Sequence, residues 1–153
     1  MSLRSAFVAV GANLGEARAA VLQAMDALDA LPQTRVARRS SLYRSAPVDA
    51  GGPDFINAVV ELETGLAPLA LLAELQRLEA EAGRERPYRN APRTLDLDLL
   101  CHGDTVLDSA TLTLPHPRMN ERAFVLLPLA EVAPAQVTAH QLAQVAGQRI
   151  ERL

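Results

Sequence analysis

Residues 93–100 read RTLDLDLL, and this stretch decides how the chain is organised. Polar and apolar residues alternate with a period of two, which is typical of a strand that buries one face. The odd-numbered leucines are predicted to face a core, while Asp96 and Asp98 face the other way. Neighbours on one strand face lie about 6.5–7 Å apart, so both carboxylates can reach common divalent cations. A solvated polar strand face is the simpler alternative for this stretch alone.

Length and composition favour one domain over residues 1–153. Hydrophobic residues make up 49%, enough for a core, and the net charge of −3 gives no overall attraction to nucleic acid or to an anionic membrane. There is no apolar run of signal-peptide type and no segment long enough to span a bilayer, so a cytoplasmic setting is expected. Cys101 is the only cysteine, which excludes an intrachain disulfide, and it is predicted to be a buried thiol.

Hydrophobic patterning elsewhere predicts the order β-α-β-β-α-β. The elements are a strand at 6–10, a helix at 16–31, strands at 35–43 and 55–63, a helix at 68–82 and the acidic strand. This order is that of the ferredoxin-like α+β fold, a mostly antiparallel sheet with helices on its face. An extra hairpin is expected from a short return strand at 105–107 and an extended piece at 112–114, followed by helices at 121–127, renewed after Pro128, and at 140–147. The glycine-bracketed stretch 11–15 is predicted to be a turn, with phosphate cradling as the alternative.

Cationic side chains flank the acidic strand. The loop 84–93 carries four arginines, and His116 lies between two prolines a short way before Arg122. Arginine binds phosphate oxygens bidentately, and phosphoryl transfer needs mainly positioning and charge neutralisation. With the carboxylate pair, these residues indicate an Mg²⁺-dependent phosphate-transfer enzyme without a P-loop, since all 15 basic residues are arginine. A non-catalytic module that binds a ligand or RNA, and an Mg²⁺-dependent nuclease or phosphatase, stay open as alternatives.

Short motifs spread over nearly the whole chain carry a family resemblance. They are GANLG at 11–15, LYR at 42–44, PDFINA at 53–58, GR at 83–84, PRTLDLD at 92–98, LPH at 114–116 and RAF at 122–124. In order and spacing they resemble the 6-hydroxymethyl-7,8-dihydropterin pyrophosphokinase family of folate biosynthesis.

The resemblance implies a ferredoxin-like core in a monomeric cytoplasmic enzyme. Such an enzyme transfers the β,γ-pyrophosphoryl group of ATP to the hydroxymethyl oxygen of 6-hydroxymethyl-7,8-dihydropterin and releases AMP. By the same likeness, Asp96 and Asp98 hold two Mg²⁺ ions, and Arg84 and Arg93 neutralise the phosphates; these four are the expected catalytic residues. No nucleic acid and no membrane is expected among its partners.

The resemblance also implies two substrate sites. The expected ATP-binding residues are Gln76, Arg84, Arg93, Leu99, Thr113, His116 and Arg122. The expected pterin-binding residues are Ser45, Ala46, Val48, Phe55, Asn57 and Phe124. An amide supplies both the donor and the acceptor that a pterin edge requires, so Asn57 would read that edge. Phe55 and Phe124 would sandwich the ring, with ordinary core packing as the alternative for both.

Some positions depart from the family pattern. The arginine-rich loop is one residue shorter before Pro92, and Asn90 or Tyr88 stands where a tryptophan is common. Pro117 replaces an aromatic residue, and Thr111 stands where a basic residue can contact the nucleotide. These departures concern affinity and loop closure over ATP, and leave the predicted reaction unchanged.

Overall fold

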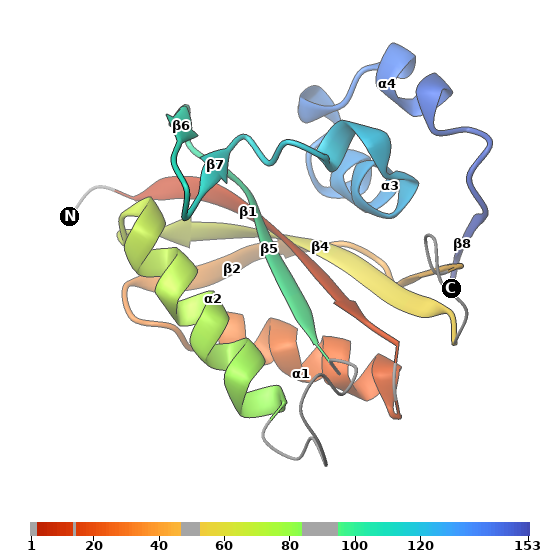
Figure 1. Cartoon of the computed structure of the whole chain (residues 1–153). Helices are drawn as coiled ribbons and strands as arrows, with labels where there is room; N and C mark the ends of the chain where they lie inside the picture. The colour runs from red at the N-terminus through yellow and green to blue at the C-terminus, as the bar shows by residue number, and fades with distance from the viewer. Residues whose placement is uncertain (1–2, 14, 47–52, 84–94) are drawn as a thin grey trace.

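A computed structural model describes residues 3–13, 15–46, 53–83 and 95–153 (Figure 1). The strands of the main sheet are β1 (Arg4–Ala12), β2 (Thr34–Arg39), β3 (Tyr43–Ser45), β4 (Phe55–Thr64), β5 (Asp96–His102) and β8 (Ile150–Arg152). Within these residues the sheet has six strands in the order β5-β1-β4-β3-β8, and β2 also pairs with β4. Every pairing between the described strands is antiparallel. The predicted ferredoxin-like α+β fold is confirmed.

Two helices, α1 (Ala17–Asp29) and α2 (Pro68–Ala82), cover one face of the sheet (Figure 1). Their buried residues are Val21, Ala24, Met25 and Leu28 of α1 and Leu71, Leu75 and Leu78 of α2. They pack on the odd-numbered leucines of the acidic stretch, all of which are buried in this core. The period-two pattern around β5 therefore predicted the core face correctly.

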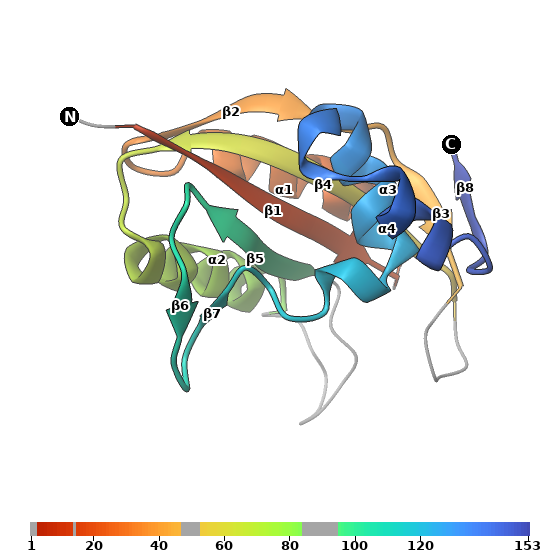
Figure 2. The same ribbon diagram turned by 90° about the horizontal axis from the view of Figure 1, so that it is seen from above.

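The opposite face lies under α3 (Ala123–Val132) and the short helix α4 (Ala139–Gln144) (Figures 1 and 2). Phe7, Val59 and Leu129 belong to a second buried cluster between the sheet and α3. Leu100 is an extra residue in β5, because Phe7 pairs with Cys101 while Val8 pairs with Leu99. This β-bulge turns Leu100 toward the second cluster.

The strand predicted at 35–43 is divided into β2 and β3, and both pair with β4. Ser40 lies at the break. Its N–H donates to the Val59 carbonyl at 2.9 Å, and its hydroxyl oxygen accepts the Val59 N–H at 2.9 Å. A side chain thus replaces one backbone partner, and the ladder is interrupted without leaving the Val59 amide unpaired.

Other elements differ from their predictions. Gly11 lies inside β1 rather than in a turn, paired with Asn57 on one side and Asp96 on the other. The return strand is β6 (Leu107–Asp108), which pairs with β7 (Thr113–Leu114) and not with β5. Pro128 lies inside α3 without ending it. Strand β8 was not predicted.

Between these elements lie two short 3₁₀ helices, Met119–Glu121 and Pro134–Gln136. Cys101 is half-buried rather than buried, and burial raises the pKa of its thiol. None of the helices in the described part of the chain is long and apolar enough to cross a membrane.

Candidate functional site

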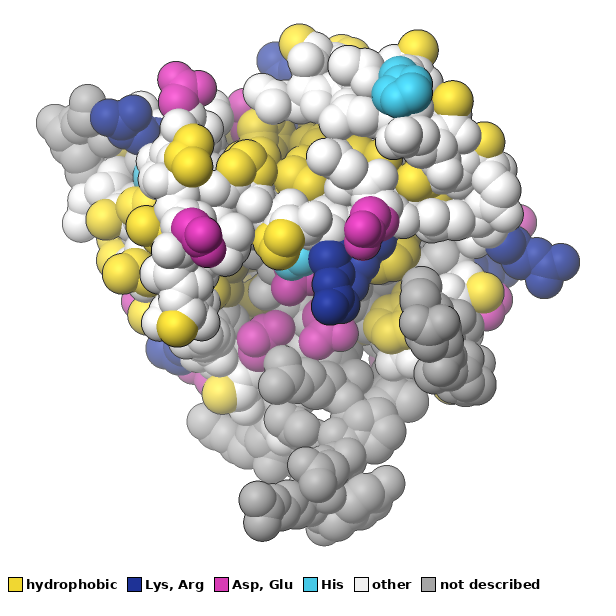
Figure 3. Space-filling model, turned by 45° about the horizontal axis from the view of Figure 1, so that its top comes forward, with side chains coloured by type: hydrophobic (Ala, Val, Ile, Leu, Met, Phe, Trp, Pro, Cys, Tyr) yellow, Lys and Arg dark blue, Asp and Glu magenta, His cyan; other side chains and the backbone are white. Residues whose placement is uncertain are grey.

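A cavity of about 210 Å³ opens between the sheet and the start of α3. Its lining residues come from β1, β3, β4, β5 and α3, which converge from distant parts of the sequence. They are Ala9, Val10, Gly11, Ser45, Ala46, Phe55, Asn57, Asp96, Asp98, Arg122 and Phe124. Eight of these were predicted as site residues. In the space-filling view, acidic, basic and histidine side chains gather near the middle of this face (Figure 3).

The floor of the cavity is β1, which runs between β5 and β4 beneath α3 (Figure 2). On this face β1 presents Phe7, then Ala9, then Gly11, so the side chains shrink toward the cavity. A Cβ added at Gly11 would lie 3.2 Å from Asn57 Oδ1 and 3.9 Å from Phe55 Cδ1. The absence of a side chain at Gly11 therefore leaves room for the amide and ring beside it.

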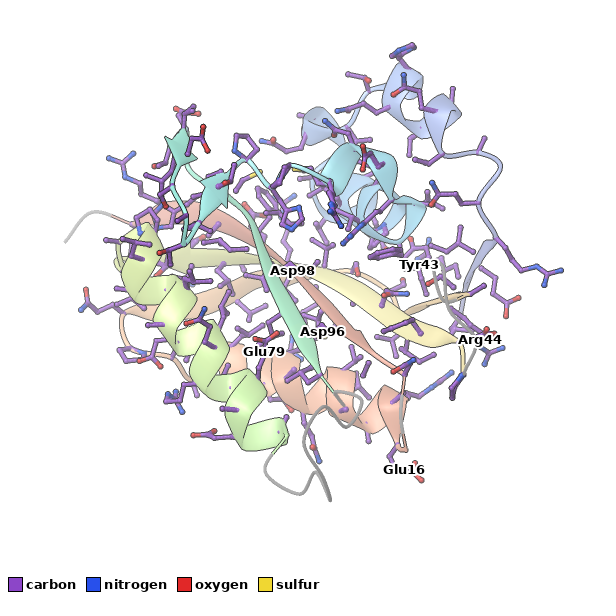
Figure 4. The ribbon with its side chains drawn as sticks, viewed as in Figure 1. Glu16, Tyr43, Arg44, Glu79, Asp96 and Asp98 are labelled. Atoms are coloured by element: carbon purple, nitrogen blue, oxygen red, sulfur yellow. The ribbon has the colours of Figure 1, made fainter. Side chains whose placement is uncertain are left out.

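The carboxylates of Asp96 and Asp98 form one wall (Figure 4). Both side chains are half-buried on the same face of β5, opposite the leucine core. Between them, the Leu97 N–H donates to Glu79 Oε2 on α2 at 2.8 Å. Because this amide lies on the outer side of the sheet's edge strand, the bond ties the strand to α2 and fixes its position.

A divalent cation with a preference for oxygen fits this wall. Mg²⁺ usually takes one or two protein carboxylates and completes its shell with water and substrate phosphate oxygens. Within the described residues, no group of three or more His, Cys, Asp or Glu side chains is gathered as a metal cage. The donor set is thus two carboxylates beside an open cavity, a set that would fit an Mg²⁺ ion.

Two aromatic rings form another part of the cavity lining. Phe55 at the start of β4 and Phe124 in the first turn of α3 both line the cavity. The Arg122 guanidinium carbon lies 5.4 Å from the centre of the Phe124 ring, within cation–π range. Both phenylalanines are half-buried, and Phe124 also packs against the second buried cluster, so its ring contributes to the core as well as to the cavity lining.

Asn57 lies between these walls, and its amide orientation is fixed. Its side chain is buried, and Nδ2 donates to the Ser45 hydroxyl at 2.8 Å. With that end engaged, Oδ1 lies over Gly11. The amide is therefore held at its Nδ2 end before any ligand arrives, which reduces the entropy lost on binding.

His116 lies close enough to Asp98 for the charge of that carboxylate to act on the imidazole. Burial lowers the pKa of His116, and Arg122 and Arg118 lower it further, while Asp98 opposes them. The Arg118 N–H donates to His116 Nδ1 at 3.1 Å. In the neutral ring Nε2 therefore carries the proton, which makes it a donor suited to an anionic oxygen.

Besides His116, which lies near Asp98 without lining the cavity, three predicted ATP-binding residues lie outside its lining. Leu99 is buried in the leucine core, Gln76 is exposed on α2, and Thr113 is half-buried on β7. Arg84, Arg93 and Val48 lie outside the described residues, as do Tyr88, Asn90 and Pro92. Thr111 and Pro117 are exposed.

Sequence reasoning missed Ala9, Gly11 and Glu79 as parts of the site. Ala9 and Gly11 continue the alternation of β1 on the face opposite the leucine core, so their small size was a usable signal. Glu79 shows no such signal, because its contact joins a helix to a distant strand.

Comparison with known proteins now bears on this geometry. The family model described as 7,8-dihydro-6-hydroxymethylpterin-pyrophosphokinase (HPPK) matches residues 7–134. The chain belongs to this family. The predicted family and enzyme type are thereby confirmed.

Curated HPPK-family relatives are similar along most of their length. The 2-amino-4-hydroxy-6-hydroxymethyldihydropteridine pyrophosphokinase of Pseudomonas aeruginosa is 49% identical over 133 residues, which cover 86% of this chain and 82% of that protein. The enzyme of the same name from Methylorubrum extorquens is 38% identical over 154 residues, covering 97% and 98%.

A solved structure shows the same fold. The crystal structure of wild-type Plasmodium falciparum HPPK-DHPS superposes with a TM-score of 0.67 at 14% identity over 87% of this chain. The present HPPK-family chain spans only 38% of that longer chain, so the likeness concerns the fold alone.

Proposed function

We propose that the chain transfers the β,γ-pyrophosphoryl group of ATP to the hydroxymethyl oxygen of 6-hydroxymethyl-7,8-dihydropterin, releasing AMP, as a step of folate biosynthesis. One observation carries the proposal. A single cavity is lined by a carboxylate pair on β5 and by two phenylalanines and a held amide on the facing wall. This arrangement suits a substrate that joins a flat heterocycle to a reacting hydroxyl.

The transfer forms one bond and breaks one bond. The pterin hydroxymethyl oxygen bonds to the β-phosphorus, the bond from that phosphorus to the oxygen of AMP breaks, and the hydroxyl proton is released. Charge spreads over the phosphoryl oxygens in such transfers, so the protein acts mainly by positioning and by neutralising charge.

Asp96 and Asp98 would hold two Mg²⁺ ions in this proposal. When bound, such ions neutralise phosphate charge and lower the barrier to loss of the hydroxyl proton. The carboxylates themselves keep a fixed spacing because β5 is tied to β1 by its ladder and to α2 through Glu79.

The pterin ring would lie over the β1 floor between Phe55 and Phe124, with its polar edge at Asn57. Ser45, Ala46 and Val48 would complete this pocket. The preset Asn57 amide offers its oxygen and its second N–H to the ring edge, and the aromatic faces exclude water from the plane of the ring.

The triphosphate would extend from Asp96 and Asp98 toward His116 and Arg122. A neutral His116 with its proton on Nε2 donates to a phosphate oxygen, and the Arg122 guanidinium adds charge. Arg84, Arg93, Gln76, Leu99 and Thr113 remain predictions for the rest of the ATP site. A monomer acting in the cytoplasm likewise remains an expectation.

Product analysis tests the proposal. The purified chain is incubated with ATP, Mg²⁺ and 6-hydroxymethyl-7,8-dihydropterin, and nucleotides and pterins are separated by ion-exchange chromatography. We expect AMP and a diphosphorylated pterin in equal amounts, with both lost on chelation of the metal. Release of ADP would contradict the proposal, and nucleotide hydrolysis without pterin would favour a phosphatase.

A further inference from the structure

The C-terminal segment 135–153 lies beyond the family-model match, yet it reaches the substrate site. Gln148, Arg149 and Ile150 form one side of a second cavity of about 710 Å³. This cavity shares Ser45, Ala46, Arg122 and Phe124 with the first. The segment therefore lies next to the residues proposed to bind the pterin.

The end of the segment extends the sheet alongside β3. In β8, Ile150 pairs with Ser45 and Arg152 pairs with Tyr43, and the Leu153 N–H donates to the Leu42 carbonyl at 2.9 Å. Strand β3 carries Ser45, the partner of the Asn57 amide. One end of the segment thus supports the β3 side of the cavity.

Its middle supports the α3 side through a single amide. Gln148 Oε1 accepts the Ala123 N–H at 2.9 Å, and Gln148 Nε2 donates to the Glu121 carbonyl at 2.7 Å. These two partners lie on either side of Arg122 in the chain. Arg122 is the N-cap of α3 and provides no side-chain cap, and Gln148 provides an acceptor for the Ala123 N–H, one of the first-turn donors that have no partner within the helix.

Packing keeps Gln148 in place. Val145 is buried against Ala123 and Leu126 of α3, and Leu142 packs at the edge of this cluster. Thr138 and Gln141 form a capping box at the start of α4. The segment is therefore anchored on both sides of Gln148, by this apolar contact and by β8.

We propose that Gln148 is a positioning residue for the pterin site, holding the turn that carries Arg122 and Phe124 against the cavity. This inference rests on the proposed function for its kinetic consequence. Without the Gln148 amide the first turn of α3 is free to fray. Phe124 then loses its fixed approach to the pterin ring, and Arg122 loses its fixed approach to the triphosphate.

Three variants test the role. Gln148→Met keeps an unbranched chain of similar length but removes both hydrogen bonds. Gln148→Glu keeps an acceptor for the Ala123 N–H but loses the donor to the Glu121 carbonyl, and its charge is favourable at a helix N-terminus. Gln144→Met is the matched control, because the Gln144 amide contacts His140 on its own helix.

Steady-state kinetics separate positioning from loss of folded protein. We expect Gln148→Met to raise the KM for the pterin about five-fold, because the two lost hydrogen bonds act on the ring only through the position of Phe124. Gln148→Glu should raise KM less than Gln148→Met does, because it keeps the bond to the Ala123 N–H, and Gln144→Met should leave KM unchanged. An unchanged KM in Gln148→Met, or a fall in apparent kcat alone, would overturn the proposal.

Amide hydrogen exchange by NMR gives a readout that needs no activity. The Ala123 amide should exchange faster in Gln148→Met than in wild type and in Gln144→Met. If the wild-type chain proved inactive, the proposed function would fail while the cap remained testable in this way. Equal exchange of the Ala123 amide in all three proteins would sink the positioning role.

Discussion

On the face covered by α1 and α2, strands β1, β4 and β5 present buried apolar side chains, with the polar Thr64 and His102 at one end. On the face under α3, the same strands present Gly11, Asn57, Asp96 and Asp98 around a cavity. Because successive strand residues point to opposite faces, each strand contributes to both. Within one strand, therefore, residues that stabilise the fold alternate with residues that line the cavity, so the two sets are neighbours along the chain.

This separation predicts opposite phenotypes for neighbouring positions. Apolar burial contributes about 1.5–3 kcal/mol for each fully buried large side chain, and the leucine face holds most of it. On the cavity face, Ala9 and Gly11 bury little apolar area because their side chains are small or absent, and the carboxylates of Asp96 and Asp98 lie side by side. Substitutions on the first face should act on stability, and those of the residues that line the cavity on turnover.

The largest effect is expected for Asp98→Ala. Removing one of two proposed Mg²⁺ ligands should lower kcat by about a thousand-fold, since metal-assisted charge stabilisation is worth several kcal/mol. The free energy of unfolding, from urea denaturation, should change little, because the carboxylate faces the cavity. Asp104→Ala, at an exposed position after β5, is the control. A wild-type rate for Asp98→Ala would refute the metal assignment.

The converse effect is expected for Leu62→Ala on the leucine face. Leu62 is fully buried in β4, so truncation should lower the free energy of unfolding by about 2–5 kcal/mol. The KM values and kcat per folded molecule should stay near wild type. A variant of normal stability but impaired KM would show that the two faces are not separate.

Gly11→Ala should sharpen the comparison by adding one methyl group to the floor. The new Cβ would lie 3.2 Å from Asn57 Oδ1, and the Ser45 hydrogen bond prevents the amide from moving away freely. We expect the KM for the pterin to rise about ten-fold, a cost of about 1.4 kcal/mol. Gly147→Ala, whose Cβ would meet open space, should leave KM unchanged. Normal pterin affinity in Gly11→Ala would argue against a ring lying over this floor.

The smallest expected effect is a pH dependence of the stability that Glu131 contributes by joining α3 to Ser41 and Tyr43. Glu131 accepts the Ser41 N–H and hydroxyl and the Tyr43 hydroxyl. Burial alone would raise the pKa of Glu131, but these donors together with Arg152 lower it from its usual 4.5. A carboxyl with a lowered pKa in the folded state contributes stability above its unfolded pKa and loses it as pH falls through the folded value.

Urea denaturation of wild type and of Glu131→Gln tests the direction in which this stability contribution changes with pH. The stability difference between them should be present at neutral pH and shrink as pH falls below the usual carboxyl value of 4.5. A constant difference across that range would contradict the assignment. Tyr43 stays protonated throughout, because burial and its bond to Glu131 raise its pKa to about 12.

The sequence predicts the fold well where periodicity is long. The bounds of α2 and the two faces of β4 match their predictions, because apolar residues recur there at helical or strand spacing. The break at Ser40 depends on a side chain replacing a backbone partner, which no local pattern reveals. Strand β8 is too short to show alternation and depends on β3, far away in the chain.

In the site, residues with a charged, amide or aromatic group that reaches the cavity could be predicted from the sequence. Residues that act through their small size or through a tertiary contact could not. Asp96, Asp98, Phe55, Asn57 and Phe124 carry charge, amide or aromatic groups, and all line one cavity. Gly11 was interpreted as part of a turn because glycine commonly marks one, whereas here its value is the space above it. The role of Gln148 depends on a tertiary contact that spacing in the sequence does not encode.

Strand β1 is hydrogen-bonded on both flanks along its cavity end, to β4 and to β5. We expect the β1 amides to exchange with solvent among the last, because local unfolding of β1 requires both neighbouring ladders to break. Whatever adjusts when a ligand enters must therefore lie above this strand, in the side chains and turns that roof it. The rigid part of the site is thus the strand at its base, and the part that can adapt lies above it.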